Sequence, residues 1–186
     1  MKKRTILLAV DLQKDFIDGT LTVPEAYKVI PVINAVKADF DLVYFTLDWH
    51  PVNHCSFKEQ GGPWPPHCVH HTAGASLPDC VLEGLEEHRM RFILKGRRPE
   101  REEYGAFVDV DPANQDLFQK GDCVVVCGIA AEYCVLETLK NLYAISEAVG
   151  FQVRVYLDGT ARFESTDTVT AFMKEKGIKE YKPKKA

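Results

Sequence analysis

One cysteine lies where the sequence predicts a strand, a tight turn and a helix in succession, a setting that suits an enzyme nucleophile. Cys134 falls in the first turn of a helix expected over residues 131–149, directly after the Gly128–Ala130 connection. Free N–H groups and the dipole at a helix N-terminus stabilise a thiolate and can also hold an oxyanion. The alternative is that Cys134 only packs, because the same helix must bury one side. The strand–turn–helix setting favours the nucleophile.

Titratable residues also follow three of the expected strands. Asp11, Asp48 and Lys95 each stand directly after a short β-like run. Any one of them alone would be interpreted as a surface residue or a helix cap. In open parallel sheets, however, ligands bind beyond the carboxyl ends of the strands. An acid, a base and a thiol brought to one edge are the components of an activated cysteine nucleophile.

A second group of residues has the spacing of metal ligands. Asp48 and His50 are two residues apart, so in an extended segment their side chains point the same way, and His67 can return from the far end of the loop. One carboxylate and two imidazoles with open coordination positions suit Zn²⁺, Fe²⁺ or Mn²⁺. Histidines in loops are more often surface or capping residues, and that is the role expected for His70, His71 and His88.

The elements that must position these residues alternate between strands and helices. Strands are expected at 5–10, 42–47, 91–94, 123–127 and 152–157, and helices at 24–38, 131–149 and 166–176. The Pro-, Gly- and His-rich stretch at about 48–88 is too long for an ordinary connection, so we expect it to be functional and to carry the metal ligands. The alternation predicts one three-layer α/β domain over residues 1–186, with a parallel β-sheet flanked by helices.

Composition narrows the class of protein. The 186 residues are 46% hydrophobic and 27% charged, which excludes a disordered chain. Lys and Arg total 23 against 27 for Asp and Glu, so neither nucleic acid nor a membrane is an expected partner. No signal peptide is recognised, and no C-x-x-C pair occurs among the six cysteines, so reduced thiols and a cytoplasmic location are expected. A small-molecule substrate is the expected partner, with homo-oligomerisation left open.

Several motifs, in this order, resemble those of the nicotinamidase and pyrazinamidase branch of the isochorismatase-like cysteine hydrolases. The resemblance covers residues 5 to 177. Each match is modest alone, but together they are highly specific. The matching segments are Asp11–Phe16, Thr46–Pro51, Asn53–Phe57, Trp64–Val69, Leu94–Gly96, Gly128–Val135 and Asp158–Ala161.

The resemblance implies a catalytic role for three residues. Cys134 would be the nucleophile, Asp11 the general base that takes its proton, and Lys95 a cationic partner that favours the thiolate. The Ile129–Ala130 peptide would be cis, and the N–H groups of Ala130 and Cys134 would form the oxyanion hole. These residues are therefore expected to meet at one point of the fold.

The resemblance also implies a metal and a pocket for an aromatic ring. Asp48, His50 and His67 would hold a divalent metal, with zinc favoured over Fe²⁺ or Mn²⁺, and the metal would bind the pyridine nitrogen of the substrate. His54 is a candidate further ligand. The residues implied to bind the substrate are Phe16, Trp64, Tyr104 and Ala130.

The expected activity is the hydrolysis of nicotinamide to nicotinate and ammonia through a cysteine thioester, in NAD salvage. Two other interpretations stay open: an amidase of the same superfamily that acts on a carbamoyl or ureido substrate, and a catalytically silent metal-binding module. The chain departs from the common family pattern at Ala131–Glu132, where a hydroxyl is missing, and in the highly charged segment Arg97–Glu103.

Overall fold

Six parallel strands form a single sheet in the order β3-β2-β1-β4-β5-β6. The computed structural model describes residues 3–111 and 116–183. The strands are β1 (Thr5–Val10), β2 (Leu42–Asp48), β3 (Met90–Lys95), β4 (Cys123–Gly128), β5 (Gln152–Thr160) and β6 (Lys179–Glu180). The predicted parallel α/β sheet is therefore confirmed, with β6 as an additional short strand.

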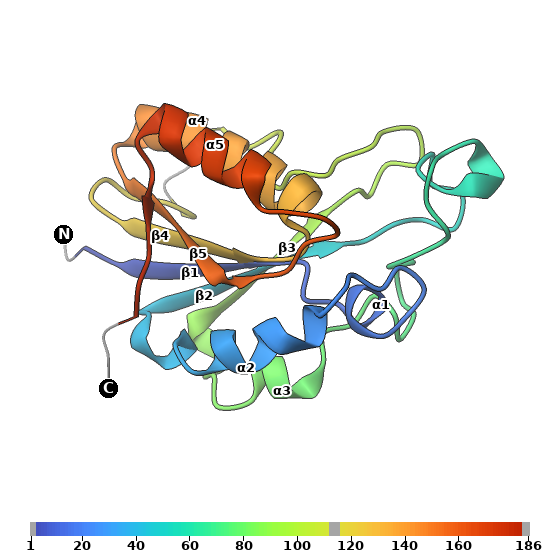
Figure 1. The fold of residues 1–186 in the computed structure, drawn as a ribbon, viewed down its shortest axis with the longest axis horizontal. Coiled ribbons are helices and arrows are strands. Elements are labelled where there is room, and N and C mark those ends of the chain that lie inside the picture. The colour runs from blue at the N-terminus through green and yellow to red at the C-terminus, as the bar shows by residue number, and fades with distance from the viewer. Residues whose placement is uncertain (1–2, 112–115, 184–186) are drawn as a thin grey trace.

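Helices cover both faces of this sheet (Figure 1). The helices α2 (Val29–Asn34) and α3 (Asp79–Leu82) lie on one face, whereas α4 (Leu136–Val149) and α5 (Asp167–Lys176) lie on the other. The short helix α1 (Lys14–Ile17) follows β1 beyond its carboxyl end. This arrangement confirms the predicted three layers. In the described ranges, no helix has both the length and the apolar character needed to cross a membrane.

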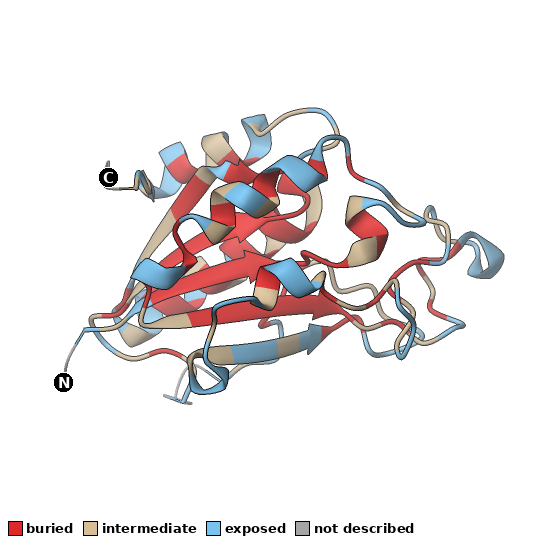
Figure 2. Ribbon diagram, turned by 90° about the horizontal axis from the view of Figure 1, so that it is seen from below, coloured by how far each residue is buried: buried red, intermediate tan, exposed pale blue. Residues whose placement is uncertain are grey.

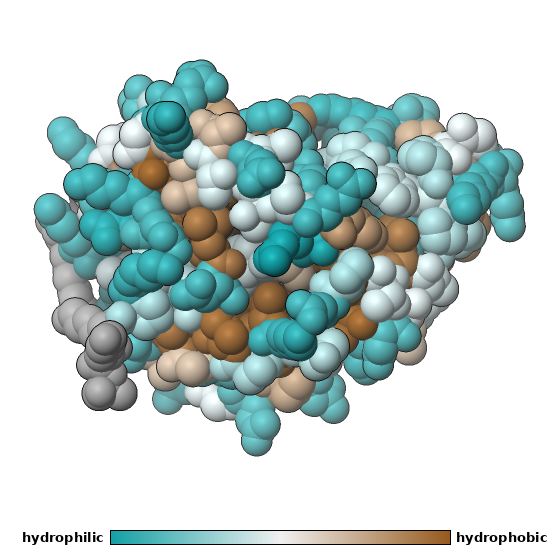
Figure 3. Space-filling model, viewed as in Figure 1, coloured by the Kyte–Doolittle hydropathy of each residue, from teal (hydrophilic) through white to brown (hydrophobic). Residues whose placement is uncertain are grey.

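The strands bury side chains on both faces, because each face is covered by a helical layer. In β1, Leu7 and Ala9 belong to the core under α2, whereas Ile6, Leu8 and Val10 belong to the core under α4. Figure 2 shows the central strands as buried over nearly their whole length. The two edge strands are less buried: Phe92 of β3 is 51% exposed, and neither residue of β6 is buried. Figure 3 shows hydrophilic residues over most of the two helical layers and apolar residues in the band between them.

The order of the strands places a crevice at one point of the sheet edge. From β1 the chain moves outward to β2 and β3, then returns to β4 on the other side of β1 and continues outward to β5 and β6. The connections after β1 and β4 therefore leave in opposite directions, and ligands bind at such switch points. Asp11 follows β1, and the turn that leads to Cys134 follows β4.

Two predicted helices differ in detail from the structure. The expected helix at 24–38 is divided into the 3-10 turn η1 (Ala26–Lys28), α2, and the 3-10 turn η2 (Lys37–Asp39). Pro31 lies within α2 and has no N–H to bond the preceding turn, which limits a regular α-helix here. The expected helix at 131–149 begins with a wider π-helical turn, η5 (Ala131–Val135), before α4.

The stretch at 48–88 is mostly irregular, as expected, but it contains three short elements. These are the 3-10 turns η3 (Lys58–Gln60) and η4 (Glu87–Arg89), with α3 between them. Isolated bridges join His50 to Val69 and Phe57 to Trp64. Backbone pairing thus folds the loop back on itself and brings its two ends together beside the carboxyl end of β2.

Candidate active site

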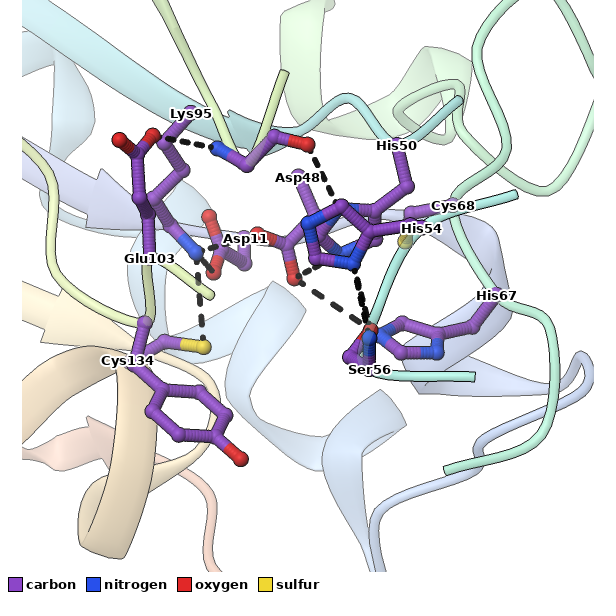
Figure 4. A network of polar contacts seen from close by, with 12 residues as sticks. Asp11, Asp48, His50, His54, Ser56, His67, Cys68, Lys95, Glu103 and Cys134 are labelled. Atoms are coloured by element: carbon purple, nitrogen blue, oxygen red, sulfur yellow. Dashed lines mark hydrogen bonds and ion pairs between the residues drawn. The ribbon is translucent and has the colours of Figure 1, made fainter. Parts of the chain in front are cut away.

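The ammonium group of Lys95 lies among three buried groups that carry or can carry negative charge (Figure 4). Its Nζ is 2.8 Å from Asp11 Oδ2, 2.5 Å from Asp48 Oδ1 and 3.6 Å from Cys134 Sγ. Each of these four residues is at most 6% exposed. The structure thus brings together all the residues to which sequence analysis assigned the nucleophile, the base and the cation.

Backbone register accounts for this meeting. Asp48 and Lys95 are paired across β2 and β3, so both side chains start from the same level of the sheet. Asp11, one residue beyond β1, has a left-handed φ of 49°. Its N–H donates to the carbonyl of Thr46, and the Thr46 hydroxyl donates to Asp11 Oδ1 at 2.7 Å. These bonds fix the Asp11 carboxylate with Oδ2 toward Lys95.

Burial dominates the electrostatics of the thiol. Burial raises the pKa of Cys134 well above its usual value, Lys95 opposes this rise in part, and the neighbouring carboxylates add to it. Lys95 thus acts in the direction that favours a thiolate, whereas burial acts against it. Loss of the thiol proton therefore needs a base close to the sulfur.

Asp11 has the properties of that base. Burial raises the pKa of its carboxyl above the usual range, with Lys95 opposing only in part. A carboxylate with a raised pKa is a stronger base at neutral pH. Within the described ranges its buried Oδ2 has no hydrogen-bond partner but forms an ion pair with Lys95, and a carboxylate oxygen of Asp11 lies within 4.8 Å of Cys134 Sγ. A lone pair of Asp11 is thus available for the thiol proton.

The turn before Cys134 is held by close packing of β4 on β1. Gly128 has a φ of 119°, and a Cβ there would lie 2.1 Å from the carbonyl oxygen of Val10, so only glycine fits. The Ile129–Ala130 peptide is cis, as expected. Tyr133 and Val135 both donate to the Ala130 carbonyl, whereas the Ala130 N–H has no backbone acceptor in the described ranges. A free N–H is what an oxyanion hole requires.

The expected metal ligands form a second cluster that shares Asp48 with the first. Asp48 Oδ2 is 3.5 Å from His50 Nε2 and 4.0 Å from His67 Nε2, and a ligand atom from each residue lies within 4.8 Å of the others. Burial alone would raise the pKa of Asp48, but Lys95 and His50 outweigh burial and lower it, so this carboxylate stays ionised. All three residues are buried.

The two imidazoles have the tautomers that metal binding needs. His50 Nδ1 lies 2.9 Å from the Gly96 carbonyl oxygen, and His67 Nδ1 lies 2.8 Å from that of Pro65. A carbonyl only accepts, so each Nδ1 donates, and each Nε2 faces Asp48. Burial lowers the pKa of His50, but the Asp48 carboxylate outweighs burial and raises it, whereas burial lowers the pKa of His67. With no proton on either Nε2, the two imidazoles and one carboxylate fit a divalent metal.

Gly96 makes the His50 contact possible. It has a left-handed φ of 62°, and a Cβ at this position would lie 2.3 Å from His50 Cε1. Glu103 Oε2 accepts the Gly96 N–H at 3.1 Å and so holds the peptide from its other side. The lysine motif thus serves both clusters, since Lys95 enters the catalytic group and Gly96 orients a metal ligand.

His54, the candidate further ligand, is occupied elsewhere. Its Nε2 is 3.1 Å from the Arg101 carbonyl oxygen, and its Nδ1 is 2.7 Å from the Ser56 hydroxyl oxygen. The ring stacks on that of His50, with centroids 4.0 Å apart. Burial and the adjacent His50 lower the pKa of His54 to about 4. His54 is therefore a neutral support for His50, and the structure does not bring it into the metal cluster.

One cavity adjoins both clusters. Its walls include Cys134, the three expected metal ligands and all four expected substrate-binding residues, Phe16, Trp64, Tyr104 and Ala130. The indole N–H of Trp64 donates to the Tyr104 hydroxyl at 2.9 Å, which ties two loops together beside the cavity. Aromatic walls with a few polar groups suit a small aromatic ligand.

Several residues of the site were missed by sequence analysis. The additional lining residues are Leu21, Glu102, Tyr133 and Phe163. Burial raises the pKa of Glu102. Gln13, fully buried, accepts the Asp48 N–H through Oε1 and donates from Nε2 to the Asp48 carbonyl, so it fixes the backbone of a ligand. Gln13 stands inside the Asp11–Phe16 motif, which was the available signal, whereas no motif or periodicity pointed to Phe163.

Comparisons with known proteins identify the family of this chain. The family model described as the Isochorismatase domain matches residues 5–177. A nicotinamidase of Saccharomyces cerevisiae is 31% identical, over 91% of this chain and 93% of the relative. A pyrazinamidase of Pyrococcus horikoshii, solved in complex with zinc, has a TM-score of 0.79 and 37% identity, covering 96% of this chain and 99% of that one.

A third relative is similar over nearly its whole length. PnC1 from L. infantum, in complex with nicotinate, has a TM-score of 0.80 and 32% identity, covering 97% of this chain and 93% of that one. Fold, sequence and the order of the site residues point the same way. The chain belongs to the isochorismatase family, in the branch that holds the nicotinamidases and pyrazinamidases.

Proposed function

We propose that this protein is a nicotinamidase, which hydrolyses nicotinamide to nicotinate and ammonia. One observation carries the proposal: a single small cavity is lined by the nucleophile Cys134 and also by Asp48, His50 and His67, which fit a metal. A planar pyridine with a carboxamide needs both kinds of site, one for the ring nitrogen and one for the amide carbon. The curated relatives of this chain, which are nicotinamidases, support the same substrate.

Attack begins with a proton transfer inside the catalytic group. Asp11 takes the proton of Cys134, and the sulfur forms a bond to the carboxamide carbon. The oxygen gains the negative charge, which the N–H groups of Ala130 and Cys134 hold. Lys95 stays protonated, because the pull of Asp11 and Asp48 outweighs burial and raises its pKa well above the usual value.

The second half of the reaction regenerates the thiol. Ammonia leaves with the proton from Asp11 as the C–N bond breaks, and a cysteine thioester remains. Asp11 then takes a proton from water, whose oxygen attacks the thioester carbon. When the C–S bond breaks, the proton returns to sulfur and nicotinate is released. One base therefore serves both steps, which its raised pKa supports.

Asp48, His50 and His67 would hold a divalent metal. The donor set favours zinc, which is also present in the structure of the Pyrococcus horikoshii pyrazinamidase. Bound there, the ion supplies a Lewis acid for the ring nitrogen of the substrate. The chain itself orients the ring through aromatic side chains, of which Phe16 and Trp64 belong to different loops. With nicotinate as its product, the enzyme would act in NAD salvage.

The test is ammonia release from nicotinamide, measured on metal-free and zinc-loaded protein. We expect turnover by the zinc-loaded wild type and none by the zinc-loaded Cys134→Ala variant. Carbamoyl and ureido compounds are assayed in parallel. Hydrolysis of those compounds in place of nicotinamide would move the assignment to a carbamoyl amidase. Absence of any hydrolysis, with the metal bound, would leave a silent metal-binding module.

A further inference from the structure

Glu132 has no part in the mechanism above, yet its side chain is tied to a distant segment. Its Oε1 accepts the N–H groups of Glu164 at 2.7 Å and Ser165 at 2.9 Å, and its Oε2 accepts that of Phe163 at 3.2 Å. Partial burial opposes ionisation of Glu132, but these N–H donors outweigh it and lower the pKa. A carboxylate that receives three backbone N–H bonds is a strong, charge-assisted anchor.

The anchored turn carries a wall of the substrate cavity. The ring of Phe163 stacks on that of Trp64, with centroids 6.1 Å apart and planes at 16°, and meets Tyr133 edge-on at 5.9 Å. Trp64 in turn meets Tyr133 at 5.3 Å and bonds Tyr104. All four aromatic residues line the cavity. They come from separate parts of the chain, so the position of Phe163 against the other three rings depends on contacts between distant segments.

The nucleophile turn, by contrast, has supports of its own. Ala131 N–H donates to the Ala161 carbonyl, Ala161 N–H donates to the Gly128 carbonyl, and Val135 N–H donates to the Ala130 carbonyl. None of these bonds involves the Glu132 side chain. Loss of the carboxylate would therefore remove hydrogen bonds from the turn at 163–165 and leave those of the turn before Cys134 in place.

We propose that Glu132 is a positioning residue that sets the shape of the substrate pocket, because its carboxylate holds Phe163 stacked on Trp64. The effect on turnover rests on the proposed function, but the effect on Trp64 does not. Glu132 acts on binding of the aromatic ring and leaves the covalent step to Cys134, Asp11 and Lys95.

The main variant is Glu132→Gln, which keeps the shape but has one oxygen acceptor and turns an NH₂ group toward backbone donors. We expect KM for nicotinamide to rise about tenfold, the equivalent of losing about one hydrogen bond to a charged group. The value of kcat should stay within about twofold, because the interaction lost is made equally in substrate complex and transition state. Glu132→Asp, which keeps the charge but is shorter, should have an intermediate KM.

Glu137→Gln is the matched control. Glu137 lies just over one turn further along the same helical segment and pairs with Lys140, at 2.6 Å on the surface. Its removal should leave KM unchanged, since such exposed pairs contribute little. A rise in KM in both glutamine variants would overturn the proposal, because it would show a general effect of charge.

A double-mutant cycle tests the route through Phe163. Phe163→Ala should raise KM as Glu132→Gln does, and combining the two should add little, because the anchor then has no ring to hold. Fully additive effects on KM would overturn the proposal. A fall in kcat at unchanged KM would also overturn it, since Glu132 would then act on the nucleophile turn.

A readout without substrate separates this proposal from the proposed function. The chain has two tryptophans, so a Trp49→Phe background leaves Trp64 as the single fluorophore. Acrylamide should quench Trp64 fluorescence more strongly in the Glu132→Gln variant than in this background alone. In the Glu137→Gln variant, quenching should equal that of the background. Unchanged quenching would overturn the anchoring role. If the wild type released no ammonia from nicotinamide, the proposed function would fail while this measurement still decided the role of Glu132.

Discussion

Asp48 and Lys95 form a buried ion pair that joins the two halves of the active site. They are partners in register on β2 and β3, and the ammonium lies 2.5 Å from Asp48 Oδ1. The other oxygen of Asp48 faces His50 and His67. One carboxylate thus pairs with Lys95 and belongs to the proposed metal cluster. A substitution at Lys95 should therefore affect metal binding, and a substitution at a metal ligand should affect the charge near Lys95.

Lys95→Met keeps the length of the side chain and removes its charge. We expect kcat/KM to fall by about 10²-fold or more, because Lys95 then no longer orients Asp11 and Cys134. Lys95 opposes the rise that burial causes in the pKa of Asp11, so its removal raises that pKa further. Activity needs ionised Asp11, and the acidic limb of the pH–rate profile should therefore move to higher pH. An unmoved limb would contradict the pairing of Asp11 with Lys95.

Cys134→Ala should abolish turnover, with a loss of about 10⁴-fold or more in kcat, because the covalent step is removed. The cavity loses only one sulfur, so nicotinamide binding, measured by calorimetry on zinc-loaded protein, should be largely kept. Cys127→Ala is the control, since Cys127 is buried in the sheet away from the cavity. Activity of Cys134→Ala within tenfold of the wild type would reject Cys134 as the nucleophile.

Removal of the metal should weaken substrate binding more than it slows attack, because a contact at the ring nitrogen is remote from the amide carbon. Nicotinamide should accordingly be hydrolysed much faster than benzamide, which has no ring nitrogen. His67→Ala should erase most of this preference. The measurement is kcat/KM for both amides on wild type and variant. Equal rates for the two amides in the wild type would refute the pyridine anchor.

Gly96→Ala should weaken metal binding by about 10–100-fold, a cost that is typical when the support of a ligand is disturbed. The new methyl group would lie 2.3 Å from the His50 ring, which must then move. Gly84→Ala is a matched control, because Gly84 also has a left-handed φ, of 77°, but has open space around its Cβ direction. Both substitutions strain the backbone, but only Gly96→Ala clashes with His50. Zinc titration of the two proteins should therefore show weaker binding for Gly96→Ala alone, and equal weakening in both would contradict the role of Gly96.

His54→Gln should keep the metal. It should remove the part of the free energy of unfolding that His54 contributes at neutral pH and that acid abolishes. The folded pKa of His54 is about 4, below its usual 6.5, so the unfolded chain binds more protons between these values. The stability that His54 contributes to metal-free protein is complete above about pH 6.5 and is lost as the pH falls toward about 4. Urea unfolding across this range should show the wild-type advantage over His54→Gln shrinking with acidity.

Zinc content provides the second readout for His54. His54→Gln should retain zinc at the wild-type stoichiometry, whereas His67→Ala should not. If the two variants lost zinc alike, His54 would be a ligand, and its bonds to Arg101 and Ser56 would have to be replaced on metal binding.

Local sequence was sufficient to predict on which strand end, turn or helix each reactive residue lies. The valine-rich β4, the glycine after it and the following helix identify the position of Cys134, because these are short-range preferences of the backbone. Asp11 follows β1, and Asp48 and Lys95 are the last residues of β2 and β3. Because parallel strands end at a common edge, the sequence was enough to predict that these three residues meet.

Tertiary structure decided the hydrogen-bond partners of those residues and the pKa values of their side chains. His54 carries the same signal in the sequence as His50 and His67, yet its ring nitrogens are taken by Ser56 and by the Arg101 carbonyl. The pKa of Cys134 is raised because the packed loops exclude water, a property that no local pattern encodes. Phe163 lines the cavity from a turn whose N–H groups bond Glu132, more than 30 residues away along the chain. Hydrogen-bond partners and solvent exclusion depend on segments that are distant in sequence, whereas strand, turn and helix depend on near neighbours.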